Sequence, residues 1–168
     1  AGTAAILARH FSLAGDAART WRYARLSAER ARSAYANPEA ASLYRMALDA
    51  ARRLPEIPAA ERVSAWTSLG DVCRLAGLFE ESLAAYRSGY RLVGNDPLAR
   101  ADLLRRRALA RERAGAFHAA LRELAALYLQ HASAAQERAQ IYQTRAAYLA
   151  PGTIRDTVND NFHVIRPE

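Results

Sequence analysis

The chain has 168 residues, 51% hydrophobic and 24% charged, which is ordinary for a folded domain. Alanine, the best helix former, is the most frequent residue, and all 24 basic residues are arginine. The formal net charge of +7 favours either an acidic partner or a solvated, arginine-rich surface. The single cysteine excludes an intramolecular disulfide and fits a reducing cytoplasm, and no apolar run reaches the ~20 residues that span a bilayer.

Helix-breaking residues, mostly glycine and proline, divide the chain into segments whose apolar residues recur at helical spacing. We expect eight helices, near residues 3–14, 17–35, 38–53, 59–76, 79–93, 97–114, 117–131 and 133–149. In Asn37-Pro38 and Asp96-Pro97 the first residue is able to cap a helix that proline opens. No segment alternates with period two, so no sheet is expected, and the short connections require antiparallel neighbours.

Each segment carries one apolar stripe, which predicts the side that the helix buries. The stripe of the second helix consists of Trp21, Ala24, Ala28, Ala31 and Tyr35, and that of the fourth of Val63, Trp66, Leu69 and Cys73. The sequence therefore predicts one all-α domain of stacked helical hairpins over residues 1–150. Residues 151–168 form a tail, either a ninth helix or a frayed segment that needs a partner.

The middle of the chain contains a pattern of large, small and aromatic residues over one helical hairpin. Its members are Trp66, Leu69, Gly70, Cys73, Gly77, Phe79, Ser82, Tyr86, Gly89 and Tyr90. We expect Gly70 to let the second helix pack closely and Gly77 to permit the tight turn, with Phe79 and Tyr86 between hairpins. The pattern resembles the tetratricopeptide repeat, whose unit is about 34 residues and whose hairpins stack into an α-solenoid.

Weaker copies of this turn lie on either side. A glycine, any residue and an aromatic recur at Gly115 and Phe117, 38 positions after Gly77 (115 − 77), and an earlier, degenerate copy places Gly15 at the turn. End repeats and divergent repeats are often degenerate in this way. The strong match covers residues 63–96, and the flanking copies would not identify the repeat by themselves.

The first half is also similar to a recurrent stretch of large bacterial signalling proteins. The matching positions are His10, Gly15-Asp16, Tyr23-Ala24, Ala28 to Ala31, Tyr35 to Ala41, Tyr44 and Ala47-Leu48. Those proteins join a nucleotide-binding ATPase module, often beside a class III adenylate or guanylate cyclase or a LuxR-type DNA-binding domain, to a tetratricopeptide region. The resemblance implies that this segment starts the repeats. Because the sequence does not begin with methionine, we expect it to belong to a longer protein.

Residues that carry chemistry do not form a recognisable pattern. The sequence has no phosphate-binding loop, zinc-binding helix or nucleophile elbow, and its histidines are scattered. Cys73 is expected in the core, and Glu80 and Glu81 are expected to favour the positive end of a helix. We therefore expect no catalytic residue, no metal and no cofactor, and a segment that is not an enzyme.

The tetratricopeptide resemblance implies a groove lined by the first helix of each hairpin. The candidate partner-binding residues are Ser64, Thr67, Asp71, Arg74, Asp102, Arg105, Leu109 and Glu112. This mixed set departs from the lysine and asparagine pattern that grips a carboxy-terminal carboxylate in chaperone-binding members. The expected function is a regulatory scaffold in the cytoplasm that binds a protein or peptide, an acidic one included, or another domain of the parent chain.

A basic nucleic-acid-binding helical domain is the alternative. Its motivation is the net charge and the run Arg105-Arg106-Arg107, followed by Arg111 and Arg113. On a helix these five arginines spread over more than one face, and the tyrosines fall on the packing stripes rather than beside them. Glu112 and Glu123 are expected to offset part of the charge. Nucleic acid is accordingly the less favoured partner.

Overall fold

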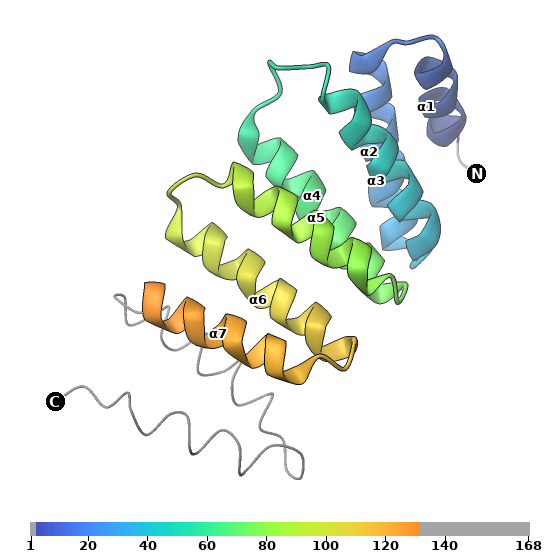
Figure 1. Ribbon diagram of the computed structural model, residues 1–168. Coiled ribbons are helices and arrows are strands. Elements are labelled where there is room, and N and C mark those ends of the chain that lie inside the picture. The colour runs from blue at the N-terminus through green and yellow to red at the C-terminus, as the bar shows by residue number, and fades with distance from the viewer. Residues whose placement is uncertain (1–2, 132–168) are drawn as a thin grey trace, which may run out of the picture.

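The structure is a computed structural model that describes residues 3–131, and these residues form seven α-helices and no strand (Figure 1). Their bounds are α1 Thr3–Leu13, α2 Ala17–Ser33, α3 Asn37–Ala51, α4 Ala59–Leu75, α5 Phe79–Leu92, α6 Pro97–Arg113 and α7 Phe117–His131. The expected all-α class is thus confirmed. The eighth expected helix, 133–149, and the tail, 151–168, lie outside the described residues.

Helices are packed in chain order. Each helix makes its main contacts with the helix before it and the helix after it, and successive helices run in opposite directions (Figure 1). Weaker contacts join α1 to α3 and α4 to α6, which are next-nearest neighbours. Because each of the inner helices α2 to α6 has two flanking partners, its apolar stripe is buried by local contacts.

Four of the connections share one backbone turn. In the α4/α5 turn the amides of Ala76, Gly77 and Leu78 donate to the carbonyls of Val72, Arg74 and Cys73, respectively. The same three hydrogen bonds, at the same spacings, close the α1/α2, α2/α3 and α6/α7 turns. The central residue has a positive φ in each: +75° at Gly15, 58° at Tyr35, +77° at Gly77 and +77° at Gly115. This motif satisfies carbonyls at the end of the first helix.

Tyr35 is the one non-glycine residue in this role and corrects an expectation from the sequence. It was placed on the apolar stripe of a helix that ran to residue 35, but α2 ends at Ser33 and the Tyr35 side chain is exposed. The prediction was wrong because the positive φ of the turn stops the helix, and periodicity cannot detect a tyrosine in that conformation.

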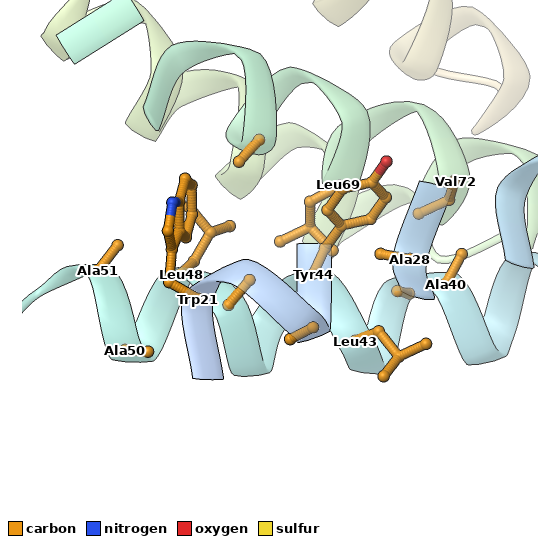
Figure 2. Packing of buried hydrophobic residues seen from close by; sticks show 14 of the residues in the cluster. Trp21, Ala28, Ala40, Leu43, Tyr44, Leu48, Ala50, Ala51, Leu69 and Val72 are labelled. Atoms are coloured by element: carbon orange, nitrogen blue, oxygen red, sulfur yellow. The ribbon is translucent and has the colours of Figure 1, made fainter. Parts of the chain in front are cut away.

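The core lies between hairpins and is built on small residues around a few large ones. Tyr44 of α3 is fully buried among residues of α2, α3 and α4, including Ala28 and Leu69 (Figure 2). Tyr86 of α5 is fully buried likewise, and a Cβ added at Gly70 would lie 2.3 Å from its ring. The close approach of α4 and α5 therefore requires the glycine, as the sequence predicted.

Two of the helix starts carry the capping chemistry of an aspartate. The Asp96 carboxylate accepts hydrogen bonds from the amides of Leu98 and Ala99, which confirms its predicted role at α6. Asp16 caps α2 in the same way through the Arg19 amide. Asn37 does not cap α3, because the helix already begins at Asn37 and Ala36 occupies the capping position.

Candidate functional site: the first-helix face

Helices α2, α4 and α6 open the hairpins α2/α3, α4/α5 and α6/α7, and their outer sides are joined by ion pairs. Arg25 of α2 lies 2.6 Å from the carboxylate of Glu61 of α4. Arg106 of α6 lies 2.5 Å from the carboxylate of Asp71 of α4. The solvent-facing side of these three helices therefore forms one continuous surface, which we call the first-helix face.

All eight candidate residues from the sequence lie on two helices of this face. Ser64, Thr67, Asp71 and Arg74 belong to α4, and Asp102, Arg105, Leu109 and Glu112 belong to α6. Ser64 is exposed, whereas the other seven are half-buried. Not all of them face a ligand freely, because Leu109 packs against the apolar cluster around Leu104 and the Thr67 hydroxyl donates to the carbonyl of Val63.

Arg106, which the sequence analysis did not select, holds the two helices together. Its guanidinium donates to Asp71 at 2.5 Å and to Asp102 at 2.6 Å, and Arg105 donates to Asp102 at 2.7 Å. Burial raises the pKa of Asp102, but the hydrogen bonds from Arg106 and Arg105 outweigh that effect and hold its pKa below the ordinary value. The network is thus an ionised, charge-assisted link between α4 and α6.

In two of the hairpins, a buried tyrosine of the second helix donates a hydrogen bond to a carboxylate of the first-helix face. Tyr86 of α5 donates to Asp71 at 2.7 Å, and Tyr44 of α3 donates to Glu29 of α2 at 2.6 Å. In both hairpins the tyrosine follows the carboxylate by 15 residues. Burial and the neighbouring carboxylates raise the pKa of both phenols, so each remains a hydrogen-bond donor.

This shared geometry identifies a third row of face residues that the sequence analysis missed. The two tyrosines are 42 positions apart (86 − 44), and so are the two carboxylates (71 − 29). The same offset relates the α4 candidates to Arg22, Arg25, Glu29 and Arg32 of α2. The signal was hidden because the α2/α3 turn carries a tyrosine, not a glycine, at its centre.

Within the described residues, Glu29, Glu61, Asp71 and Asp102 of the face have partners, whereas Glu112 and some of the arginines have none. Glu29 accepts hydrogen bonds from Tyr44 and from Arg32, the latter at 2.8 Å. Within residues 3–131, Arg22 and Arg74 have no ion pair with an acidic side chain. The face therefore offers guanidinium donors more than acceptors.

Apolar side chains are also exposed on this face. Leu26 of α2 is 43% exposed and Leu75 of α4 is 58% exposed. Large exposed leucines beside charged groups are a common composition for a surface that binds another protein. The arrangement is suited to contact with a ligand, and it presents no nucleophile beside a base.

The single thiol lies away from this face and is unreactive. Cys73 is fully buried, next to the ion pair of Arg45 and Glu81. In this pair the Arg45 guanidinium donates to both carboxylate oxygens, and its Nη2 lies 2.7 Å from Glu81 Oε2. Burial raises the pKa of Cys73 to about 11, so the thiol is protonated at neutral pH. Glu81, expected only to favour a helix end, in fact links α3 to α5.

The described residues contain no group of three or more side chains arranged to hold a metal ion. None of their helices combines the length and the hydropathy needed to cross a bilayer. A scan against models of protein families finds no match to this chain, and a search of curated proteins finds no significant match.

Proposed function

We propose that this chain is a tetratricopeptide-type scaffold that binds a protein or peptide on its first-helix face. The observation that supports this most is the recurrence of one hairpin design: the same turn hydrogen bonds, and the same tyrosine-to-carboxylate bond 15 residues apart. A design repeated along the chain places equivalent side chains of successive helices in a row. Such rows are the basis of ligand binding in repeat proteins.

The composition of the face supports a role in binding rather than in catalysis. Glu29, Asp71 and Asp102 are held by internal hydrogen bonds, and Arg22, Arg74, Leu26 and Leu75 remain available to a ligand. Guanidinium groups beside exposed leucines suit a peptide that carries both carboxylates and apolar side chains. We place this module in the cytoplasm, in line with its protonated, unpaired thiol.

The parent protein that we propose is a bacterial signalling or transcription-regulating ATPase. The support is the resemblance of the first half to the segment that begins the repeat region in such proteins. Reading the coding sequence around this segment tests the assignment directly. A phosphate-binding loop upstream is the expected finding, and a complete frame without one would leave a free-standing adaptor.

Site-specific photo-crosslinking in cell extract tests the binding face. A photoreactive residue replaces Ser64, which is exposed on α4, and in the control it replaces Ala84, which is exposed on α5. We expect a discrete crosslinked partner at position 64 and none at position 84. The double variant Arg22→Glu, Arg74→Glu should abolish the crosslink at position 64. Equal crosslinking at both positions would contradict the assignment of the face.

The nucleic-acid alternative has a separate test. Binding to duplex or single-stranded DNA would fall steeply with salt, because phosphate contacts release counterions. We expect no salt-dependent binding at physiological ionic strength, since many arginines of α6 are bound to Asp71, Asp102 or Glu123. Strong binding that weakens with salt would favour the alternative over the scaffold.

A further inference from the structure

A second charged cluster lies on the other side of α6, where it packs between α5 and α7. Three arginines of α6 lie on the side of the helix that packs against its neighbours, where apolar residues are expected. They are Arg100, Arg107 and Arg111, and their neighbours on that side, Leu104 and Ala108, are buried. Arginine at such positions is unusual, because charged side chains are rarely placed between helices without a matching partner.

Within the part of the chain that the structure describes, these arginines have fewer acidic partners than their charge requires. Arg107 lies 2.8 Å from Glu123 of α7, and Arg111 pairs with the other oxygen of the same carboxylate. Arg87 of α5 is close enough to lower the pKa of Arg107. Of the described residues, only Glu123 supplies a carboxylate to Arg107 or Arg111.

Tyr90 of α5 lies close to two of these arginines, Arg100 and Arg107. The guanidinium of Arg100 lies 4.9 Å from the centroid of its ring. The Tyr90 phenol is also near Arg107, whose pKa is lowered first by burial and then by the neighbouring arginines, against the effect of Glu123. Helices α5, α6 and α7 lie side by side here (Figure 1), so the cluster draws on three helices.

Two hydrogen-bond donors of the cluster have no acceptor among the described residues. They are the buried Nε atoms of Arg100 and Arg107. A buried guanidinium nitrogen without an acceptor costs free energy, which an anion of suitable geometry recovers. The side chain of Arg107 is only 16% exposed, so an anion bound there would be largely shielded from solvent.

We propose that Arg87, Arg100, Arg107 and Arg111, with Tyr90, form a binding site for a phosphate-class oxyanion between α5, α6 and α7. Arg107 and Arg111 share the Glu123 carboxylate, and Arg87 and Arg100 add two further guanidinium groups, so the described part of the cluster carries a net positive charge. The planar fork of arginine matches the tetrahedral oxygens of phosphate and donates two hydrogen bonds at once. The site is separate from the first-helix face and does not depend on the function proposed for that face.

Titration with inorganic phosphate tests this site. Binding is measured by calorimetry and by the NMR signals of the arginine Nε–H groups, with chloride at equal ionic strength as the reference. We expect saturable binding of phosphate and shifts confined to the arginines of the cluster. Shifts that are equal in phosphate and chloride would overturn the proposal.

Two matched variants decide whether the cluster is responsible. Arg87→Gln removes an exposed member and should weaken phosphate binding about tenfold, which corresponds to the loss of one charge-assisted hydrogen bond. Arg53→Gln makes the same charge change at an exposed position just after α3 and should leave the Kd unchanged. Equal weakening in both variants would mean a general charge effect and would overturn the site.

Glu123→Gln separates an anion site from a purely structural cluster. Removing the carboxylate that competes for Arg107 and Arg111 should tighten phosphate binding, whereas a structural role predicts no gain in affinity. If this variant does not fold, Arg87→Gln still decides the question. A neutral peptide with and without one phosphoserine then distinguishes the source: tighter binding than free phosphate points to a phosphorylated protein, and equal binding to the free ion.

Discussion

The hairpins α2/α3 and α4/α5 perform the same structural task with different residues. Tyr44 and Tyr86 are both fully buried and both donate to a carboxylate 15 residues earlier. At the equivalent positions, however, the first hairpin has Ala28 and Tyr35 where the second has Gly70 and Gly77. The two hairpins therefore share the buried tyrosine and its bond to a carboxylate, whereas the residues at the helix contact and at the turn differ between them.

Truncation of the buried tyrosines should give the largest effect. Tyr86→Ala and Tyr44→Ala should each destabilise the fold by about 3–5 kcal/mol, because each empties a fully buried site. Urea denaturation followed by circular dichroism gives both values. Tyr35→Ala is the control, since that ring is 86% exposed, and it should change stability little. A large loss of stability for only one of the two buried tyrosines would contradict the equivalence of the two hairpins.

The small residue beneath each tyrosine should be far less exchangeable in the second hairpin. Gly70→Ala places a Cβ 2.3 Å from the buried ring of Tyr86 and should cost about 1–3 kcal/mol through overpacking. Ala28→Gly, the reverse change in the first hairpin, should cost about 1 kcal/mol through lower helix propensity. The measurement is again chemical denaturation. Stabilisation by Gly70→Ala would show that α4 and α5 can separate at no cost.

Removal of only the phenolic hydroxyl should affect the two hairpins equally. Tyr44→Phe and Tyr86→Phe each remove a hydrogen bond to a carboxylate, which should cost about 1–2 kcal/mol. A double-mutant cycle of Tyr86→Phe with Asp71→Ala isolates the pair from other effects. A coupling energy near zero would mean that Asp71 is held by Arg106 alone.

Exchange of the turn residues should have opposite signs in the two hairpins. Tyr35 has a φ of 58°, so Tyr35→Gly relieves strain and should stabilise the fold by about 0.5–1 kcal/mol after the entropy cost of glycine. Gly77→Tyr should destabilise it by a similar amount. Thermal unfolding of both variants measures the difference. Destabilisation by Tyr35→Gly would indicate that the exposed ring has a role beyond the turn.

The ion pair between the hairpins should give the smallest effect, visible as a dependence on pH. The hydrogen bond from Arg45 lowers the pKa of Glu81, so this contribution to stability is present above the ordinary pKa and is lost as the pH falls through the lowered value. Because Glu81 is about one-third exposed, we expect under about 1 kcal/mol. Unfolding free energies between pH 6 and about pH 3 should show this loss, and Arg45→Gln should reduce it.

Local patterns in the sequence were sufficient to predict where the helices begin and end. The spacing of apolar residues and the positions of glycine and proline predicted the bounds of the seven described helices to within two residues. They also predicted glycine's role at positions 70 and 77, because close helix contact excludes a side chain and positive φ disfavours one. The helix bounds and the turn depend on neighbours a few residues away, and the role of Gly70 follows from the repeat pattern that also contains Tyr86.

Contacts between distant residues were decided by the tertiary structure. No spacing rule indicates that Arg106 reaches Asp71, that Glu81 pairs with Arg45, or that Tyr35 adopts the turn conformation of a glycine. The sequence predicted that Glu123 offsets part of the charge of the arginine run, but it did not predict that Arg107 is buried beside Glu123. The partner of a charged side chain depends on which helix packs beside it. The packing of the helices is determined by the free energy of the whole fold rather than by any one segment.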